Sequence, residues 1–144
     1  MARILLLLLW VVGAGTTLLL PDRSSAQTLA MREQGALRWA CGGVGFEERA
    51  ALAELRPQAN VELLFVTEPR GGYLADILVA LYEGDADAPM LSLRADGPIC
   101  LLHLPAGRYR IEASRLGEHR SAGASGGMPD GKPRRTILAF PEEP

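Results

Sequence analysis

One serine of this chain has the spacing of a catalytic nucleophile. The run Gly123-Ala124-Ser125-Gly126-Gly127 matches G-x-S-x-G, the sharp turn that presents the serine of α/β hydrolases. That turn requires a strand before the serine, a helix after it, and an acid and a histidine further along the chain. Both histidines of this chain, His103 and His119, precede Ser125. We therefore expect a glycine-rich loop here, no catalytic residue, and a protein that is not an enzyme.

Motifs for metal ions and phosphates are also incomplete. Zinc and copper sites use three or four converging ligands, so the two histidines would form one only with further ligands and if the strands brought them together. The acidic run Glu83–Asp87 begins like a calcium loop, but Pro89 stands where a further ligand belongs. Gly42–Gly45 lacks the lysine of a phosphate-binding loop, and we interpret it as a hinge. The sequence predicts no metal and no cofactor.

The amino-terminal residues have the order of a secretory signal peptide. Arg3 precedes the apolar run Ile4–Leu20, and the small residues Ser24-Ser25-Ala26 follow. We expect cleavage after Ala26, a mature chain that begins at Gln27, and export to the periplasm, with membrane contact only through the signal segment. The alternative is an uncleaved membrane anchor, since the run approaches the roughly 17 to 25 residues that span a bilayer.

Length and charge limit what the mature chain can be. Removing 26 of the 144 residues leaves 118, which is enough for one domain with one core. The whole chain has 15 basic and 17 acidic residues and a net charge of −2; cleavage removes two arginines and one aspartate, which makes the charge −3. A mildly acidic chain lacks the positive surface of a nucleic-acid binder. We expect no nucleic acid among its partners.

Export gives the two cysteines a specific meaning. In an oxidising compartment Cys41 and Cys100 can form a disulfide that closes a loop of 59 positions, and the lost entropy of the unfolded chain then stabilises the fold by about 4 kcal/mol. The alternative is two separately buried thiols. Because Ile99 and Leu101 share one face of their strand, we expect Cys100 to project away from the inner core, toward a covering segment.

The remaining pattern predicts a mainly β fold. Phe46–Arg56 has the features of a short helix, with Gly45 as N-cap and Pro57 as its stop. The apolar run Ile99–Leu104, a tight Pro-Ala-Gly turn and then Gly107–Leu116, in which apolar and polar residues alternate, predict a half-buried β-ribbon. Further strands are expected at 60–67, 74–82, 90–95, 118–122 and 135–140, with a mobile loop at 123–133.

These strands predict a six- to seven-stranded Ig-like or prealbumin-like sandwich, or an open barrel, with one short N-terminal helix. We divide the chain into a signal peptide at 1–26, an N-terminal segment with the helix at 27–59, the sandwich at 60–140 and a frayed tail at 141–144. No internal repeat is evident.

One motif carries a family resemblance. Asp96-Gly97, an apolar strand, and then Leu104-Pro105-Ala106-Gly107-Arg108-Tyr109-Arg110-Ile111 resemble the repeat of carboxypeptidase regulatory-like domains, the prealbumin-like (transthyretin-like) sandwiches. The likeness covers about residues 60–140, and Gly42–Leu55 before it resembles a group of small exported proteobacterial proteins of unknown function. The resemblance implies a stabiliser, linker or binding module. The C-terminal Pro141–Pro144 does not resemble the tyrosine-rich end of the transthyretin-related hydrolases.

Two sets of residues are candidate binding surfaces. Four arginines are expected on one charged outer face, which is either solvated or recognises an anionic partner: Arg108, Arg110, Arg115 and Arg120. Trp39 together with Tyr73 could form a platform for a sugar. We expect an exported, non-catalytic binding module whose partner is an envelope protein. The first alternative is a carbohydrate or small-ligand binding protein that contacts a surface saccharide, and the second is a hydrolase or metalloprotein, which would need His103, His119 and an acid to converge.

Overall fold

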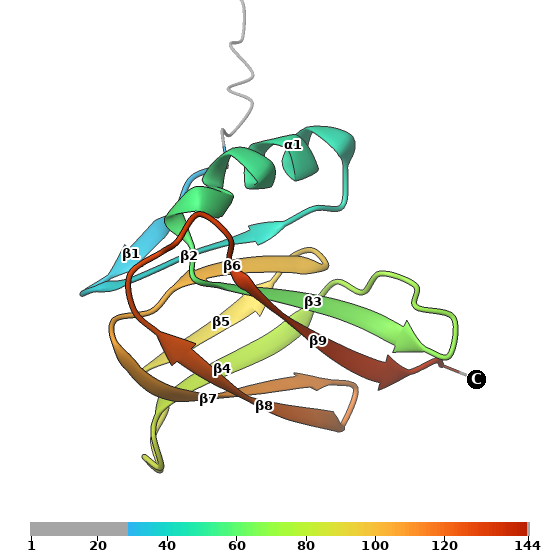
Figure 1. The fold of residues 1–144 in the computed structure, drawn as a ribbon. Helices are drawn as coiled ribbons and strands as arrows, with labels where there is room; N and C mark the ends of the chain where they lie inside the picture. Colours follow the sequence, from blue (N-terminus) through green and yellow to red (C-terminus); the bar gives the residue numbers. More distant parts are fainter. Residues whose placement is uncertain (1–28, 144) are drawn as a thin grey trace, which may run out of the picture.

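Nine strands form two sheets that face each other in a computed structural model, which describes residues 29–143 (Figure 1). The expected signal peptide and its cleavage site lie outside the described residues. The five-stranded sheet has the order β1-β2-β6-β3-β9 and the four-stranded sheet the order β5-β4-β7-β8. The strands are β1 (Arg32–Gln34), β2 (Leu37–Gly42), β3 (Val61–Glu68), β4 (Ile77–Glu83), β5 (Leu91–Ala95), β6 (Ile99–His103), β7 (Gly107–Arg115), β8 (Glu118–Gly126) and β9 (Arg134–Pro141).

The mainly β fold with one short helix is confirmed, and two strands are additional. Helix α1 (Phe46–Leu55) begins after Gly45 as expected and continues into the short 3-10 helix η1 (Arg56–Gln58). Strands β1 and β2 lie in the segment 27–59, in which we expected a helix and no strand. In β2, Leu37 faces the space between the sheets and Ala40 faces the helix, and both are buried. A strand covered on both faces loses the alternation that would identify it.

The main core lies between the two sheets. Phe65 of β3 and Phe140 of β9 meet Ile77 of β4 and Ile111 of β7, and all four side chains are almost completely buried. Burial of each such side chain stabilises the fold by about 1.5–3 kcal/mol relative to an exposed position. This core fixes which face of each strand points outward.

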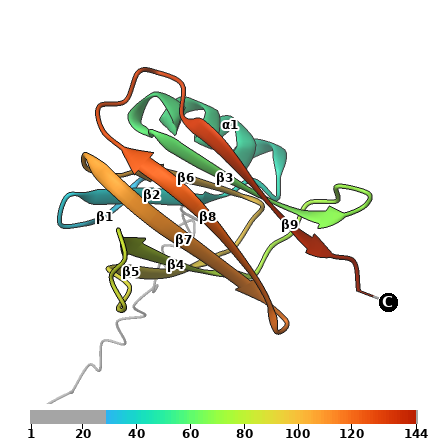
Figure 2. The same cartoon turned by 60° about the horizontal axis from the view of Figure 1, so that its bottom comes forward.

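Helix α1 covers only part of the outer face of the five-stranded sheet. Leu52 of α1, Ala59, and two residues of the sheet, Ala40 of β2 and Leu101 of β6, form a second, smaller core. Figures 1 and 2 show α1 on the side of this sheet that faces away from β7 and β8. The helix therefore covers the β2–β6 half of the outer face and does not extend over the β3–β9 half.

The motif around residues 99–114 is not a β-ribbon, which corrects the prediction. Strand β6 pairs with β2 and β3, whereas β7 pairs with β4 and β8, so the connection at 104–106 crosses from one sheet to the other. Alternation in β7 shows that one face is buried, but it does not identify the neighbouring strand. The crossing is held by Tyr109, whose hydroxyl donates to the carbonyl of Pro105 at 2.8 Å, and by Asn60, whose amide donates to the carbonyl of Leu104 at 2.7 Å.

Both segments expected to be mobile near the C-terminus are more ordered than predicted. Strand β8 continues to Gly126, so the connection to β9 begins only at residue 127. At Gly126 a Cβ atom would overlap the carbonyl oxygen of Pro105, which explains why a glycine stands in this strand position. In the expected tail, Pro141 is still part of β9, and Glu143 forms an ion pair with Arg115 at 3.1 Å.

Candidate functional site

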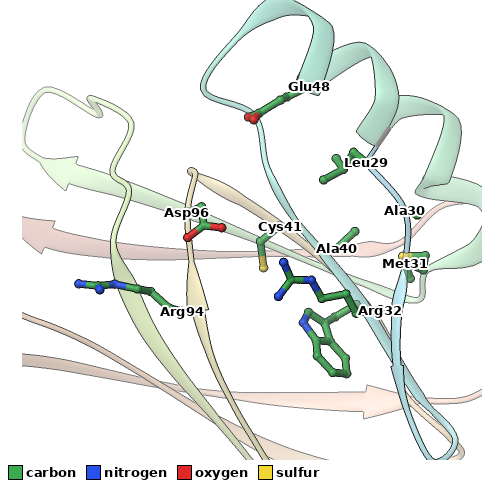
Figure 3. A pocket seen from close by; sticks show the side chains of 10 residues that line it. Leu29, Ala30, Met31, Arg32, Ala40, Cys41, Glu48, Arg94 and Asp96 are labelled. Atoms are coloured by element: carbon green, nitrogen blue, oxygen red, sulfur yellow. The ribbon is translucent and has the colours of Figure 1, made fainter. Parts of the chain in front are cut away.

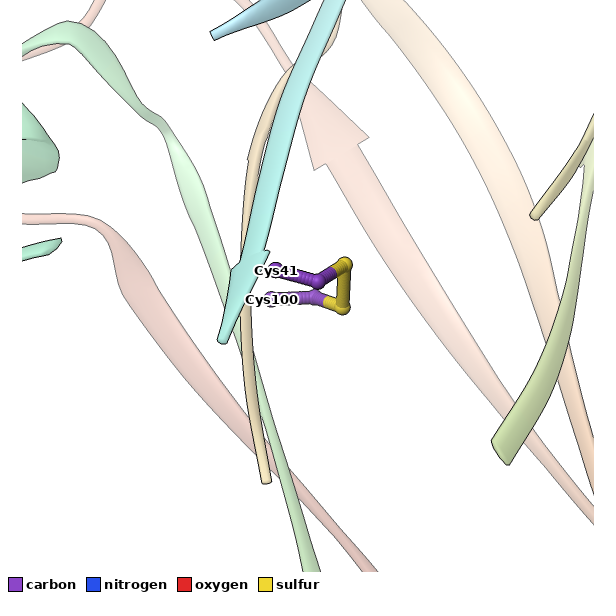
Figure 4. Close-up of a disulfide and its surroundings, with 2 residues drawn as sticks. All are labelled: Cys41 and Cys100. Atoms are coloured by element: carbon purple, nitrogen blue, oxygen red, sulfur yellow. A yellow bond between two sulfur atoms is a disulfide. The ribbon is translucent and has the colours of Figure 1, made fainter. Parts of the chain in front are cut away.

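The predicted disulfide is present between neighbouring strands. Cys41 of β2 and Cys100 of β6 are directly opposite in the antiparallel register, with 4.1 Å between their Cα atoms (Figure 4). The expectation that Cys100 projects away from the inner core is wrong. Cys100 belongs to the core between the sheets, whereas Ile99 and Leu101 pack toward the helix. Both faces of β6 are covered, so apolar character alone could not identify the inner face.

Two arginines of β7 lie on the outer face of the four-stranded sheet, and one of them interacts with other residues of that sheet. Arg108 and Arg110 point away from the core on alternate positions. The guanidinium of Arg110 lies 4.3 Å from the ring centre of Tyr82, and its Nε donates to Glu112 at 3.1 Å. Arg110 therefore already interacts with residues of its own sheet in the absence of a partner.

The other two predicted arginines do not join this face. Arg120 is opposite Ala113 in the register and so points to the inner side, where its guanidinium lies 5.3 Å from the ring centre of Phe140. Its Nε also donates to the carbonyl of Ala139 and so links β8 to β9. Arg115, at the end of β7, pairs with Glu143. The four arginines thus occupy three different places.

Trp39 and Tyr73 do not form a common platform. Trp39 is on the inner face of β2, half-buried against the main core, in register with Leu102. Tyr73 is opposite Val66, on the outer face, with 64% of its surface exposed. Leu102 is paired with Val61, five positions before Val66 on β3, so the two aromatic residues are separated by about 16 Å along the strands as well as by the sheet itself.

The residues with possible catalytic or metal-binding chemistry are also far apart. The Nδ1 atom of His103 lies 3.2 Å from the carbonyl oxygen of Gln58, on the helix side of the five-stranded sheet. His119 is opposite Ser114 on the outer face of the other sheet. Ser125 lies in β8, six positions and about 20 Å from His119. Within residues 29–143, no three His, Cys, Asp or Glu side chains are grouped in a way that could hold a metal ion.

An apolar strip, in which Tyr73 and Ile137 are exposed and the other members are half-buried, lies beyond the part of the five-stranded sheet that α1 covers. We call it the outer strip; its members point outward from β3, β9 and the segment after β3, and they are Leu64, Val66, Tyr73, Ile137 and Ala139. Leu64 is opposite Ile137 and Val66 is opposite Ala139, so the side chains form a continuous surface across the strand pair. Ile137 has 59% of its surface exposed. Contiguous exposed apolar surface of this kind marks interaction sites.

The sequence contained a signal for this strip. The runs Leu63–Val66 and Ile137–Phe140 are apolar without interruption, and β3 and β9 pair in parallel. Such runs are typical of parallel strands that are buried on both faces. In the structure the inner face of each strand is buried by the core, whereas on the outer face Ile137 is exposed and Leu64, Val66 and Ala139 are half-buried.

A cleft opens at one edge of the sandwich, between β1 and β2 of one sheet and β5 of the other (Figure 3). It has a volume of about 540 Å³, and Trp39, Arg32, Arg94 and Asp96 are among the residues that line it. Arg94 also forms an ion pair with Asp76 at 3.4 Å, whereas Arg32 has no ion pair within the described residues. The cleft therefore combines an indole ring with groups that can donate and accept hydrogen bonds.

Comparisons with known proteins do not assign the chain to a family. Neither protein-family models nor curated proteins give a match. In residues 29–143, no helix has the combination of length and hydropathy that crossing a bilayer requires. The disulfide is typical of proteins from oxidising compartments.

Proposed function

We propose that this chain is an exported, non-catalytic docking module that binds another protein through the outer strip. One observation carries the proposal: α1 covers the β2–β6 half of an outer sheet face, whereas within residues 29–143 the apolar side chains of Ile137 and Tyr73 over β3 and β9 stay exposed. A partner that buries Ile137 and Tyr73 would remove from water the surface that the fold itself does not cover. Aromatic residues are enriched in the buried centres of protein interfaces.

The proposed location is the periplasm. A signal peptide at 1–26 would deliver the chain to a compartment where Cys41 and Cys100 are oxidised. The resemblance of the segment around Leu104-Pro105-Ala106-Gly107 to carboxypeptidase regulatory-like domains supports the same function, because the two-sheet architecture is compatible with an Ig-like domain and such domains serve as binding modules. We assign the chain to that class as part of the proposal.

Site-specific photo-cross-linking in intact cells tests the docking proposal. A photoreactive residue replaces Ile137 in the outer strip, and in a matched chain it replaces Leu116, which is 73% exposed but stands alone in the turn between β7 and β8. We expect one dominant cross-linked envelope protein from position 137 and none from position 116. Equal cross-linking patterns at the two positions would contradict the proposal, and a cross-link to a second copy of this chain would replace it with self-association.

The cleft at the sheet edge favours a second candidate, the binding of a small neutral saccharide. A half-buried indole can stack on a sugar ring while Arg32 and Asp96 hydrogen-bond to its hydroxyls. Fluorescence of Trp39, the single tryptophan of the chain that begins at Gln27, tests this candidate. A saturable change with a pyranose that disappears in Asp96→Ala supports it, and an unchanged signal across a panel of hexoses contradicts it.

A further inference from the structure

One carboxylate is buried on the outer face of β3. Glu62 has only 2% of its surface exposed and is the only charged residue among the described residues that is buried to this extent. Arg56 of η1 donates to it from Nε at 2.8 Å and from Nη2 at 3.1 Å. Arg135 of β9 donates from Nε at 2.9 Å, and its Nη2 lies 2.8 Å from the same oxygen. Burial of a charge is tolerated when it is paired and hydrogen-bonded in this way.

The two guanidinium groups are held in place but are not enclosed. The side chain of Arg56 is 39% exposed and that of Arg135 is 52% exposed. Each turns Nε and Nη2 toward Glu62, and within the described residues neither Nη1 atom has a hydrogen-bond acceptor. Glu62 thus positions two cationic groups side by side with donors left for a further acceptor.

A third cation completes a notch at this place. A cavity of about 310 Å³ is lined by Arg56, Glu62, Lys132, Arg135 and residues of the 127–133 connection. The ammonium group of Lys132 has no ion pair in the part of the chain that the structure describes. The nearby Asp130 accepts a hydrogen bond from the backbone N–H of Lys132 at 3.2 Å, but it lines the neighbouring cavity and not this one. Three cations and one carboxylate give the notch a formal charge of +2 in a chain whose net charge is −2.

We propose that this notch, formed by Arg56, Lys132 and Arg135 around Glu62, binds the phosphate group of a phosphate monoester. Such a group carries nearly two negative charges at pH 7, which matches the local excess of +2. Guanidinium groups bind phosphate through paired, charge-assisted hydrogen bonds, and arginines already oriented by a buried carboxylate lose little side-chain freedom when they bind. The proposal does not depend on the docking function of the outer strip, because it rests on different side chains.

The single lysine of the chain provides a selective probe. Reductive methylation with ¹³C-formaldehyde labels Lys132 and the amino terminus and retains the positive charge of both. The labelled chain is titrated at constant ionic strength with inorganic phosphate, glycerol 3-phosphate or chloride, and the Lys132 methyl signal is followed by NMR. We expect a saturable shift with both phosphates and none with chloride.

Two neighbouring arginines give matched variants. Arg135→Gln should weaken phosphate binding about tenfold, because one charge-assisted interaction is lost. Arg134→Gln removes the same charge one position earlier, at a residue that lines the neighbouring cavity, and should leave binding unchanged. A circular dichroism spectrum checks the fold of each variant, and Arg135→Lys replaces Arg135→Gln if the latter does not fold, with the same weakening expected.

Two outcomes would overturn the proposal. The first is a Lys132 signal that does not saturate with phosphate or that shifts equally with chloride. The second is equal weakening by the two glutamine variants, which would indicate general electrostatic attraction instead of a site. Once saturation with phosphate is seen, two arms distinguish its source: tighter binding of glycerol 3-phosphate than of vesicles that contain phosphatidic acid assigns a soluble ester, and the reverse order assigns a lipid headgroup.

Discussion

The two outer faces of this sandwich differ in whether their side chains find partners within the fold. On the four-stranded sheet, Arg110 stacks on Tyr82 and pairs with Glu112, so this charge is already paired within the outer face of its own sheet. On the five-stranded sheet, α1 covers β2 and β6, whereas Ile137 and Tyr73 over β3 and β9 remain exposed. A charged face that is internally paired requires no ligand, and an apolar face that is only half covered is the better candidate for an interface.

The disulfide gives the largest expected effect, because it holds β2, and with it the covered half, to β6. Reduction, or the double substitution Cys41→Ala with Cys100→Ala, should lower the free energy of unfolding by about 4 kcal/mol through the released 59-residue loop. Urea unfolding with and without reductant measures this difference. A change below about 1 kcal/mol would mean that strand pairing alone holds β2 in place.

A pair of alanine substitutions sharpens the contrast between the covered and the uncovered half. Leu101→Ala removes a fully buried side chain beneath α1 and should cost about 3 kcal/mol. Ile137→Ala in the outer strip should change stability by no more than about 0.5 kcal/mol in the isolated protein, because that side chain is exposed. Chemical denaturation compares the two variants directly. Similar losses from both would show that the outer strip is already covered.

The crossing between the sheets provides a pH-dependent test. Burial, and then the negative charge of Glu83, raise the pKa of Tyr109 above its ordinary value of 10.0. The unfolded chain therefore releases this proton at lower pH than the folded chain, and the contribution to stability is complete below pH 10 and is lost as the pH rises toward the folded pKa. Tyr109→Phe should lose about 1 kcal/mol at pH 7 with the hydrogen bond to Pro105, and its stability should fall less between pH 9 and 11.

Thermal unfolding across this pH range checks the difference between Tyr109→Phe and the parent chain. Other groups titrate equally in both proteins, so the difference isolates Tyr109. Parallel stability curves would contradict the assignment.

The smallest effect is expected on the charged face. Arg110→Ala removes one exposed ion pair and one contact with the ring of Tyr82, which together contribute about 1 kcal/mol or less. High salt should reduce this difference further, since exposed charges are screened. Denaturation at low and high ionic strength measures it. A loss above about 2 kcal/mol would show that this face is a structural network and not a solvated surface.

The sequence predicts the direction of side chains correctly where one face of a strand is buried and the other is exposed to solvent. Alternation correctly placed Tyr109 and Ile111 inward and Arg108 outward in β7. It failed where both faces are covered or apolar: β2 was missed, and the inner face of β6 was assigned to Ile99 and not to Cys100. Local pattern therefore predicts that a strand exists, but not which layer lies on each side of it.

The candidate sites were harder to predict for a related reason. The outer strip depends on where α1 ends, and the notch depends on Arg56, Glu62 and Arg135 meeting across three elements, so neither is visible in the spacing along the chain. The expected arginine surface failed to form as one face because Arg120 is opposite Ala113 and therefore points inward. Counting positions predicts reliably which face a side chain points to within one strand. Across a turn the count no longer predicts the face.

We propose that a partner binds the half of the five-stranded sheet that α1 does not cover, and not the charged sheet. The most direct measurement compares photo-cross-linking yields in the same cells from position 137 in the outer strip and from position 121, which is on the outer face of β8 opposite Glu112. We predict one specific protein adduct at position 137, lost when Tyr73→Asp is added, and no adduct at position 121. Cross-linking at position 121 with none at position 137 would contradict the account.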